Sequence, residues 1–192
     1  MQMEMQPDDD ASSSGEPVPE VPTARMISWA KNSSLYRLNQ KMMTERALFD
    51  ALKKKALTKF AGISAELAGK IAGEGIAFCM EHKLLDDRTY AEVKTRSGSR
   101  SGHSRRRIAR DLGNKGVARP LIEETLVDVD DLASAINYAR KRAFGPFRKV
   151  PLDEKRKAKE FSAFARNGYS AAIAIKVLGL SDEELEEIER QA

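Results

Sequence analysis

A helical pattern that recurs three times along the 192 residues constrains this chain more than any other feature. Each time, an amphipathic segment is followed by a second segment that stops near a small residue, and then by a short turn and a third segment. Apolar residues recur three or four positions apart, which is typical of α-helices. One unit of about 50 residues buries little core alone, so the units must stack. The sequence therefore predicts an all-α fold of tandem three-helix repeats that form an elongated, curved array.

The turn after the second helix is the clearest evidence for the repeat. Residues 114–117 (Asn-Lys-Gly-Val) and 166–169 (Arg-Asn-Gly-Tyr) both place glycine before an apolar residue, as at a left-handed helix end. The matching anchors in the second helices are Leu48, Leu52 and Ala56; Ile108, Leu112 and Gly116; and Phe161, Phe164 and Gly168. In the first copy, Lys53–Lys55 and Ala56 stand where the glycine turn is expected, and extra residues follow. A degenerate first repeat is predicted.

Polar residues mark the expected helix starts. Thr44, Ser64, Ser104 and Ser170 precede apolar stripes as N-caps, the acidic pairs at 86–87 and 130–131 do the same, and residues 181–184 form a capping box. In the first helix, Leu35, Leu38 and Met42 are expected to form the buried stripe. His82 is expected near a helix C-terminus.

These signals divide the chain into three parts. Residues 1–25 are expected to be a disordered acidic tail, 26–180 to hold the repeats (about 33–83, 84–129 and 130–180), and 181–192 to form a short acidic helix. No apolar run is long enough to cross a membrane, no secretory signal opens the chain, and the lone Cys79 can form no disulfide within it. We expect a cytoplasmic protein with no membrane association.

Charge is distributed unevenly along the chain. Residues 25–180 hold 32 of the 33 basic residues but 17 of the 29 acidic ones, because both ends are acidic. A body this basic favours a polyanionic partner or an acidic protein groove. An ordinary solvated surface is the alternative.

The densest basic run provides the candidate contact residues. It comprises Arg96, Arg100, Arg105, Arg106, Arg107, Arg110, Lys115 and Arg119. A second group begins with Arg140, Lys141 and Arg142 and continues with Arg148, Lys149, Lys155, Arg156, Lys157 and Lys159, and the weakest candidates are Lys53, Lys54, Lys55 and Lys59. Serines and glycines between 97 and 102 are expected to loosen the first part of the run. Arg106 and Arg110 lie four apart, so they share a helix face.

Nothing in the sequence suggests catalysis. The chain has two histidines, one cysteine and no zinc-ligand spacing. Asp86 and Asp87 suit a helix cap better than a catalytic pair, and His103 is expected to be solvated. Residues 72–75 (Ala-Gly-Glu-Gly) lack the Lys-Ser/Thr ending of a phosphate loop. The aromatic residues fall mostly at packing positions. We expect no enzyme, no catalytic residue, no metal and no cofactor.

Two motifs together resemble the RecX family. They are residues 84–91 (Leu-Leu-Asp-Asp-Arg-Thr-Tyr-Ala) and, after a basic linker, residues 107–117, which end in Lys-Gly-Val. The resemblance extends over about 27–180. Residues 140–147 and 164–170 look like the form found in proteobacterial members.

The resemblance implies a monomeric arc of three-helix repeats that binds in the groove of the RecA recombinase filament on single-stranded DNA. Family members restrain the ATP hydrolysis, strand exchange and co-protease activities of RecA, and some bind DNA directly, so weak direct DNA binding is also expected here. The alternative is a general helical DNA-binding module or transcription regulator, since two short helices around Asn114–Gly116 fit a helix-turn-helix.

Overall fold

A computed structural model describes residues 19–191, and this part of the chain is helical with no strand. The helices are α1 (Ala24–Gln40), α2 (Glu45–Lys59), α3 (Ala65–Glu81), α4 (Asp87–Arg100), α5 (Arg105–Asn114), α6 (Arg119–Thr125), α7 (Asp131–Arg142), the 3₁₀ helix η1 (Gly145–Phe147), α8 (Glu154–Arg166), α9 (Ala171–Leu178) and α10 (Asp182–Gln191). No helix among the described residues is long and apolar enough to span a bilayer.

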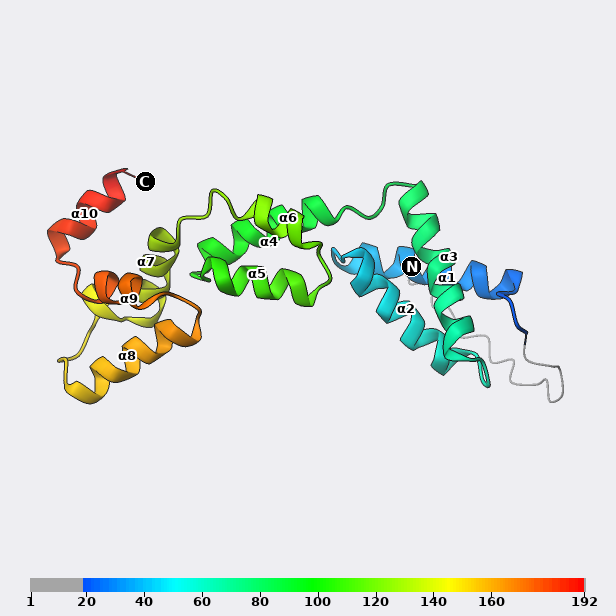
Figure 1. The fold of residues 1–192 in the computed structure, drawn as a ribbon, viewed down its shortest axis with the longest axis horizontal. Helices are drawn as coiled ribbons and strands as arrows, with labels where there is room; N and C mark the ends of the chain where they lie inside the picture. The colour runs from blue at the N-terminus through cyan, green and yellow to red at the C-terminus, as the bar shows by residue number, and fades with distance from the viewer. Residues whose placement is uncertain (1–18, 192) are drawn as a thin grey trace, which may run out of the picture.

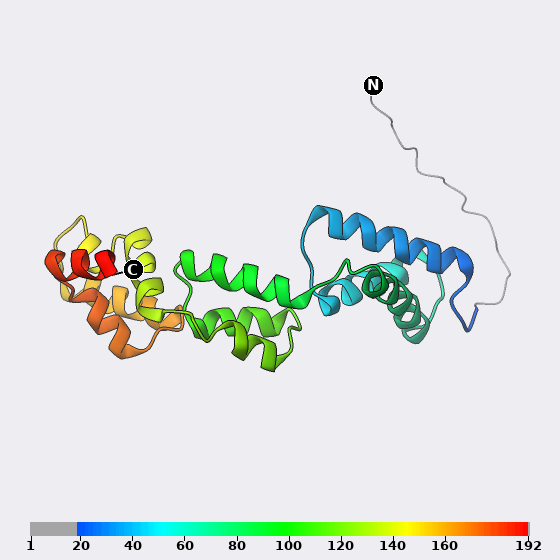
Figure 2. The same cartoon turned by 90° about the horizontal axis from the view of Figure 1, so that it is seen from above.

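The helices form three groups in a row: α1–α3, α4–α6 and α7–α9, with α10 at the far end (Figures 1 and 2). In Figure 1 the outer groups extend lower than the middle group, so the row bends toward the side where α2, α5 and α8 lie. The predicted all-α array of tandem three-helix repeats, elongated and curved, is confirmed.

The ends of the array differ slightly from the predicted boundaries. Residues 1–18 of the expected acidic tail lie outside the described residues. Helix α1 begins at Ala24, where the Thr23 hydroxyl accepts a hydrogen bond from the Met26 amide, so helix starts before residue 26 and well before residue 33. The predicted boundaries near 84 and 130 fall between α3 and α4 and between α6 and α7, and α10 lies within the range expected for the acidic helix.

The predicted N-caps are confirmed. The Thr44, Ser64, Ser104 and Ser170 hydroxyls each accept a hydrogen bond from the amide three residues later, and Asp86 and Asp130 cap α4 and α7. Ser181 and Glu184 exchange both bonds of the capping box. His82 ends α3, and its Nδ1 lies 2.9 Å from the Phe78 carbonyl oxygen. Local side-chain chemistry therefore sets where these helices begin and end.

The buried stripe predicted for the first helix is wrong for two of its three residues, because only Leu38 packs against a core cluster. Leu35 and Met42 are 42% and 47% exposed, whereas the buried residues of α1 are Met26, Ala30 and Ser34. The cause is the close approach of α3, because a Cβ added to Gly75 would lie 2.8 Å from the Ser34 hydroxyl oxygen. Two helices that approach so closely need small residues between them.

The first repeat was predicted to be degenerate, and this prediction is wrong. Helix α2 continues through Lys53–Lys55 to Lys59, with Leu48, Leu52 and Ala56 fully buried. Its glycine is Gly62, which adopts a φ of +77° shortly before the Ser64 cap. The turn is therefore present, after a helix of 15 residues rather than the 10 of α5.

The small residues at 97–102 do not loosen the chain. Residues 97–100 continue α4. A Cβ on Gly98 would lie 2.9 Å from Ile108 of α5, and one on Gly102 would lie 2.7 Å from the Tyr138 backbone. The Ser99 hydroxyl lies 2.7 Å from that of Ser134 on α7. The lack of side chains lets α4 pack closely on α5 and on the next repeat.

Neighbouring repeats meet through the start of a second helix. The Thr44 hydroxyl, which caps α2, also donates a hydrogen bond to the Lys115 carbonyl at the end of α5, over 2.5 Å. The Ser104 hydroxyl, which caps α5, donates in the same way to the Asn167 carbonyl at the end of α8, over 2.7 Å. Thr44 and Ser104 are both fully buried. We call these two contacts the first and second joints.

A carboxylate reinforces each joint. The Glu45 amide donates to Asp87 of α4 over 2.9 Å, and the Arg105 amide donates to Asp131 of α7 over 2.6 Å. The first amides of a helix have no partner inside the helix, and a carboxylate there also interacts favourably with the helix dipole. The next repeat thus supplies part of the cap of the preceding repeat.

A glycine in each joint lets the two backbones approach. Gly116 has a φ of +83°, and an added Cβ would lie 2.5 Å from Cβ of Arg46; Gly168 has a φ of +91°, and an added Cβ would lie 2.5 Å from the Ser104 hydroxyl. Both the backbone conformation and the space require glycine at these positions.

An ion pair closes the third repeat. Glu160, which is 1% exposed, accepts hydrogen bonds from Arg148 over 2.9 and 2.8 Å and from the Gly145 amide over 3.1 Å. Burial alone would raise the pKa of Glu160, but these hydrogen bonds outweigh it and hold the pKa below its ordinary value. The pair fastens η1 to α8.

Replacing Ser104 by Ala removes both the cap and the joint hydrogen bond. We expect the free energy of unfolding to fall by about 2 kcal/mol, the sum of about 1 for each interaction. The matched control is Ser64→Ala, which removes a cap without a joint and should cost about 1 kcal/mol. Urea unfolding of both variants checks this, and equal losses would show that the joint bond contributes nothing.

Two glycine substitutions should change stability in opposite directions. Gly116→Ala should destabilise the protein by about 2 kcal/mol, because it strains the backbone and displaces Arg46. Gly73→Ala in α3 should stabilise it by about 0.5 kcal/mol, because no atom lies within 4 Å of the added Cβ and alanine favours helix. Thermal unfolding measures both changes. A gain of stability in Gly116→Ala would contradict the joint as described.

The Arg148–Glu160 pair should make stability depend on pH. Because the folded-state pKa of Glu160 is lowered, its contribution is present above the ordinary value of 4.5 and is lost as pH falls through the folded value. Glu160→Gln should cost about 3 kcal/mol at pH 7, and the gap to the unmodified protein should narrow below pH 4.5. Urea unfolding over pH 3–7 tests this. Glu74→Gln, at an exposed site, is the control, and a gap that stays constant with pH would contradict the assignment.

Candidate polyanion interface

Positive charge lies on the first and second helices of each repeat, and it is equally high in all three second helices. The second helices each carry a net charge of +3, from five basic and two acidic residues in α2, four and one in α5, and five and two in α8. They lie along the concave side of the row in Figure 1. The sequence showed only that residues 25–180 are basic. The structure shows that three equivalent basic helices, α2, α5 and α8, lie on the same side.

Helices α3, α6 and α10 have a net negative charge, whereas α9, the third helix of the last repeat, has one lysine and no acidic residue. Helix α3 has three glutamates and one lysine, and α6 has two glutamates and one arginine. Helix α10 has six acidic residues and one arginine, and it lies at the opposite edge of the row from α8 in Figure 1. The acidic helices α6 and α10 therefore lie away from the concave side, whose three cationic helices favour the approach of a polyanion.

The candidate residues on α5 have two kinds of environment. Arg105, Arg106 and Arg110 are exposed, and Arg110 lies 3.8 Å from Asp111. Arg107 is half-buried at the second joint, where its guanidinium donates to the Asn167 side chain over 2.5 Å and lies 3.7 Å from Asp111. Arg107 thus helps to hold the joint, whereas the other three face solvent.

Arg96 and Arg100 do not join the α5 residues. They line a separate cleft of about 430 Å³ between α4, α6 and the start of α7. Acidic side chains share that cleft, namely Glu92, Asp128 and Asp130. Three carboxylates and two arginines give this cleft no net positive charge, so it is less suited to a polyanion than the α5 face is.

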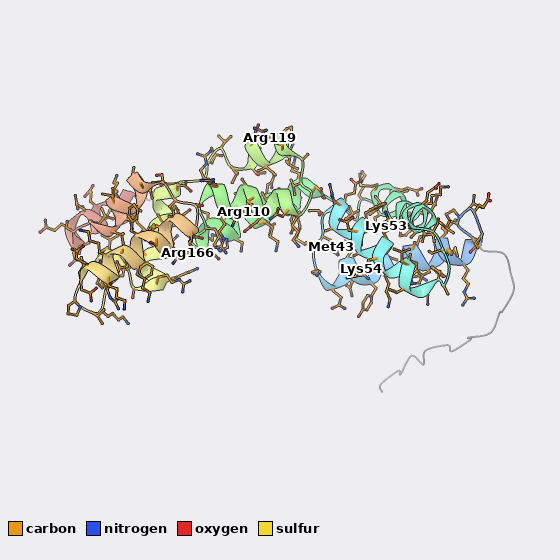
Figure 3. The ribbon with its side chains drawn as sticks, turned by 60° about the horizontal axis from the view of Figure 1, so that its bottom comes forward. Met43, Lys53, Lys54, Arg110, Arg119 and Arg166 are labelled. Atoms are coloured by element: carbon orange, nitrogen blue, oxygen red, sulfur yellow. The ribbon has the colours of Figure 1, made fainter. Side chains whose placement is uncertain are left out.

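Lys115 and Arg119 also lie apart. Lys115 ends α5, and its carbonyl serves the first joint. Arg119 belongs to α6, donates to Glu123 over 2.8 Å, and is labelled at the opposite edge from Arg110 and Arg166 in Figure 3. The run that is continuous in sequence is therefore split over at least two faces.

The first three residues of the second candidate group lie at the C-terminal end of α7. Arg140 stacks over Phe147 with 5.0 Å between the guanidinium carbon and the ring centroid, and Arg142 lies 5.9 Å from the Tyr138 ring centroid. The Lys141 ammonium donates to the Arg100 carbonyl over 3.3 Å. The group bridges α4 and α7, and Arg142 extends toward α8.

The sequence ranked three basic residues of this side too low: Lys54 and Lys159 were weaker candidates, and Arg166 was not among the candidates. Lys54 on α2 and Lys159 and Arg166 on α8 are exposed on second helices, and Figure 3 labels Lys54, Arg110 and Arg166 along one side of the row. Grouping the basic residues by repeat position, rather than by density along the chain, would have given them more weight.

A larger cleft of about 590 Å³ lies between α4 and α5. His103 lines it and is half-buried rather than fully solvated as expected, and burial followed by the charge of Arg107 lowers its pKa. Within residues 19–191, no three His, Cys, Asp or Glu side chains are placed to hold a metal ion.

Comparison with family models identifies the middle of the chain. Residues 86–126, which contain α4 to α6, match the model described as RecX, second three-helix domain. The match covers the middle repeat and the residues of the Asp-Asp-x-x-Tyr-Ala motif.

Known proteins resemble nearly the whole chain. The regulatory protein RecX of Agrobacterium fabrum is 52% identical over 167 residues, which cover 87% of this chain and 91% of the relative. The regulatory protein RecX of Myxococcus xanthus is 30% identical, with 83% and 89% covered. The crystal structure of RecX from Lactobacillus salivarius superimposes with a TM-score of 0.58 at 19% identity, over 88% of this chain and 99% of that one.

Proposed function

Because this chain belongs to the RecX family of regulatory proteins, we propose that it binds the filament that the RecA recombinase forms on single-stranded DNA. Bound there, it restrains ATP hydrolysis, strand exchange and co-protease activity. The protein acts as a monomer in the cytoplasm, without a cofactor and without catalysing a reaction itself.

One observation carries the proposal: the three second helices present a net charge of +3 each on the same, concave side of the array. A filament of recombinase on DNA is a long, helical polyanion with a groove. A curved row of cationic helices can follow such a groove and contact several of its subunits in succession.

The joints support this use of the surface. Each joint contains a buried hydroxyl, a carboxylate and a glycine, so the spacing between α2, α5 and α8 is fixed by hydrogen bonds. Cationic groups that are already held in position lose little conformational entropy when they bind. A bound array that spans neighbouring subunits then hinders the rearrangement that accompanies ATP turnover.

Only some of the basic residues predicted from the sequence belong to the proposed contact surface. We propose Arg105, Arg106 and Arg110 as the principal contacts, with Lys54 on α2, because they are exposed on second helices. The residues at the end of α7 extend this surface. Arg96 and Arg100 share a cleft with carboxylates and Arg119 pairs with Glu123, all on other faces, so we exclude these three from the contact surface. Lys115 is exposed at the end of α5, at the margin of that surface.

The helix-turn-helix alternative fits α5 and α6 poorly. The second helix of such a motif enters the major groove of DNA. Here that helix, α6, is seven residues long, and its two glutamates pair with Arg119 and with Arg88. Its net negative charge opposes approach to a duplex.

The direct test is the ATPase activity of a bacterial RecA on single-stranded DNA, with this protein titrated in. We expect the unmodified protein to lower the rate. Replacing Lys54, Arg106 and Arg110 together by Gln should raise the half-inhibiting concentration by about tenfold, since each charge-assisted contact is worth on the order of 1 kcal/mol or less at an exposed site. Arg107 is left unchanged because it holds the joint.

The matched control replaces Arg96, Arg100 and Arg119 together by Gln, which removes the same number of charges from other faces. Its half-inhibiting concentration should stay within about twofold of the unmodified protein. No effect of the unmodified protein on ATP hydrolysis would overturn the proposed function. An equal loss in both triple variants would overturn the assignment of the surface.

A further inference from the structure

A small cleft at the second joint collects cationic side chains from three helices. It has a volume of about 280 Å³, and it is lined by Arg107 of α5, Tyr138 and Arg142 of α7, Phe144 after α7, and Lys159, Ala163, Arg166 and Asn167 of α8. Four of these side chains are positively charged, and none is acidic.

Three of the four cations have no anionic partner. Within residues 19–191, no carboxylate oxygen lies within 4.0 Å of the charged groups of Arg142, Lys159 or Arg166. Arg107 has its hydrogen bond to Asn167, which orients its guanidinium at the edge of the cleft. Like charges gathered without partners repel one another and lower stability, so packing alone does not account for them.

The first joint serves as an internal control. It has the same hydroxyl, carboxylate and glycine as the second joint. Counted from the same caps, the positions of Arg107, Arg142 and Arg166 are occupied there by Ala47, Gly98 and Asn114. A joint therefore forms without this set of cations, and the cluster has a separate role.

We propose that the cleft at the second joint binds one backbone phosphate of a nucleic-acid strand. The guanidinium groups of Arg142 and Arg166 offer paired N–H donors that match phosphate oxygens, and Lys159 adds a third charge. The phosphate oxygens replace the missing anionic partners. This inference rests on the proposed function and extends it, because it identifies where the DNA backbone is held.

The surroundings favour a nucleic-acid phosphate over an acidic peptide. The cationic side continues beyond the cleft along α5 to α2, as expected for an anion that repeats at regular intervals (Figure 3). The rings in the cleft do not offer a stacking surface: the Tyr138 hydroxyl donates to the Ala163 carbonyl over 3.3 Å, and Phe144 packs beside Tyr138 and Phe164. Binding is therefore to the backbone and independent of base sequence.

The test measures binding of the full chain to a fluorescent oligothymidylate by anisotropy, without recombinase, over a series of salt concentrations. Lys159→Gln together with Arg166→Gln should make the slope of log Kobs against log salt shallower by about 0.7, since the variant loses one phosphate contact on a single strand. Arg119→Gln, at the opposite edge, should leave the slope unchanged.

A folding control accompanies this measurement. Both substituted side chains are exposed, so the double variant should keep its helical circular dichroism, and its melting temperature should stay the same or rise as repulsion is relieved.

Three results would overturn the proposal: an unchanged slope in the double variant, an equal change in Arg119→Gln, or tighter binding of a fluorescent oligoglutamate than of oligothymidylate at equal salt. None of these outcomes bears on RecA inhibition, which is measured separately, so failure of this site and failure of the proposed function can be told apart.

Discussion

The arrangement of this protein depends on a hydroxyl group that serves two helices at once. In each joint the side chain that caps a second helix also donates to the carbonyl at the end of the next second helix. A buried polar group of this kind is costly when it is unpaired and directional when it is paired. The joint therefore specifies one relative placement of neighbouring repeats, which apolar contact alone would leave less defined.

This placement converts local charge into a surface. A single second helix with a net charge of +3 is an ordinary solvated helix. Three of them held at fixed spacing on a concave side form an extended cationic surface, while α6 and α10 carry the opposite charge elsewhere. The second joint adds a cluster of cations that the first joint lacks, so the cationic surface is not uniform along its length.

Much of the fold was predictable because its rules are local. N-caps, the capping box and the glycine turns at 116 and 168 each depend on residues close in sequence, and the structure contains them all. The errors arose where small residues allow close packing between helices. Ser34, Gly75 and Gly98 carry no apolar periodicity, so a search for apolar stripes overlooked them and assigned Leu35 and Met42 to the core instead.

The candidate surface was only partly predictable, for a similar reason. The density of arginines along the chain indicated a polyanion partner but not which arginines share a face. Arg119 follows Lys115 closely in sequence yet pairs with Glu123 on another side. Lys159 and Arg166 come from a distant segment, and only the second joint brings them beside Arg142.

Amide hydrogen exchange by NMR tests the joints most directly. The first amide of a helix normally exchanges fast because it has no partner in the helix. If Asp87 and Asp131 close the joints, the Glu45 and Arg105 amides will exchange at least about a hundredfold more slowly than the Ala65 amide, which begins α3 outside any joint. Equally fast exchange at all three amides would contradict joints that hold the repeats in one arrangement.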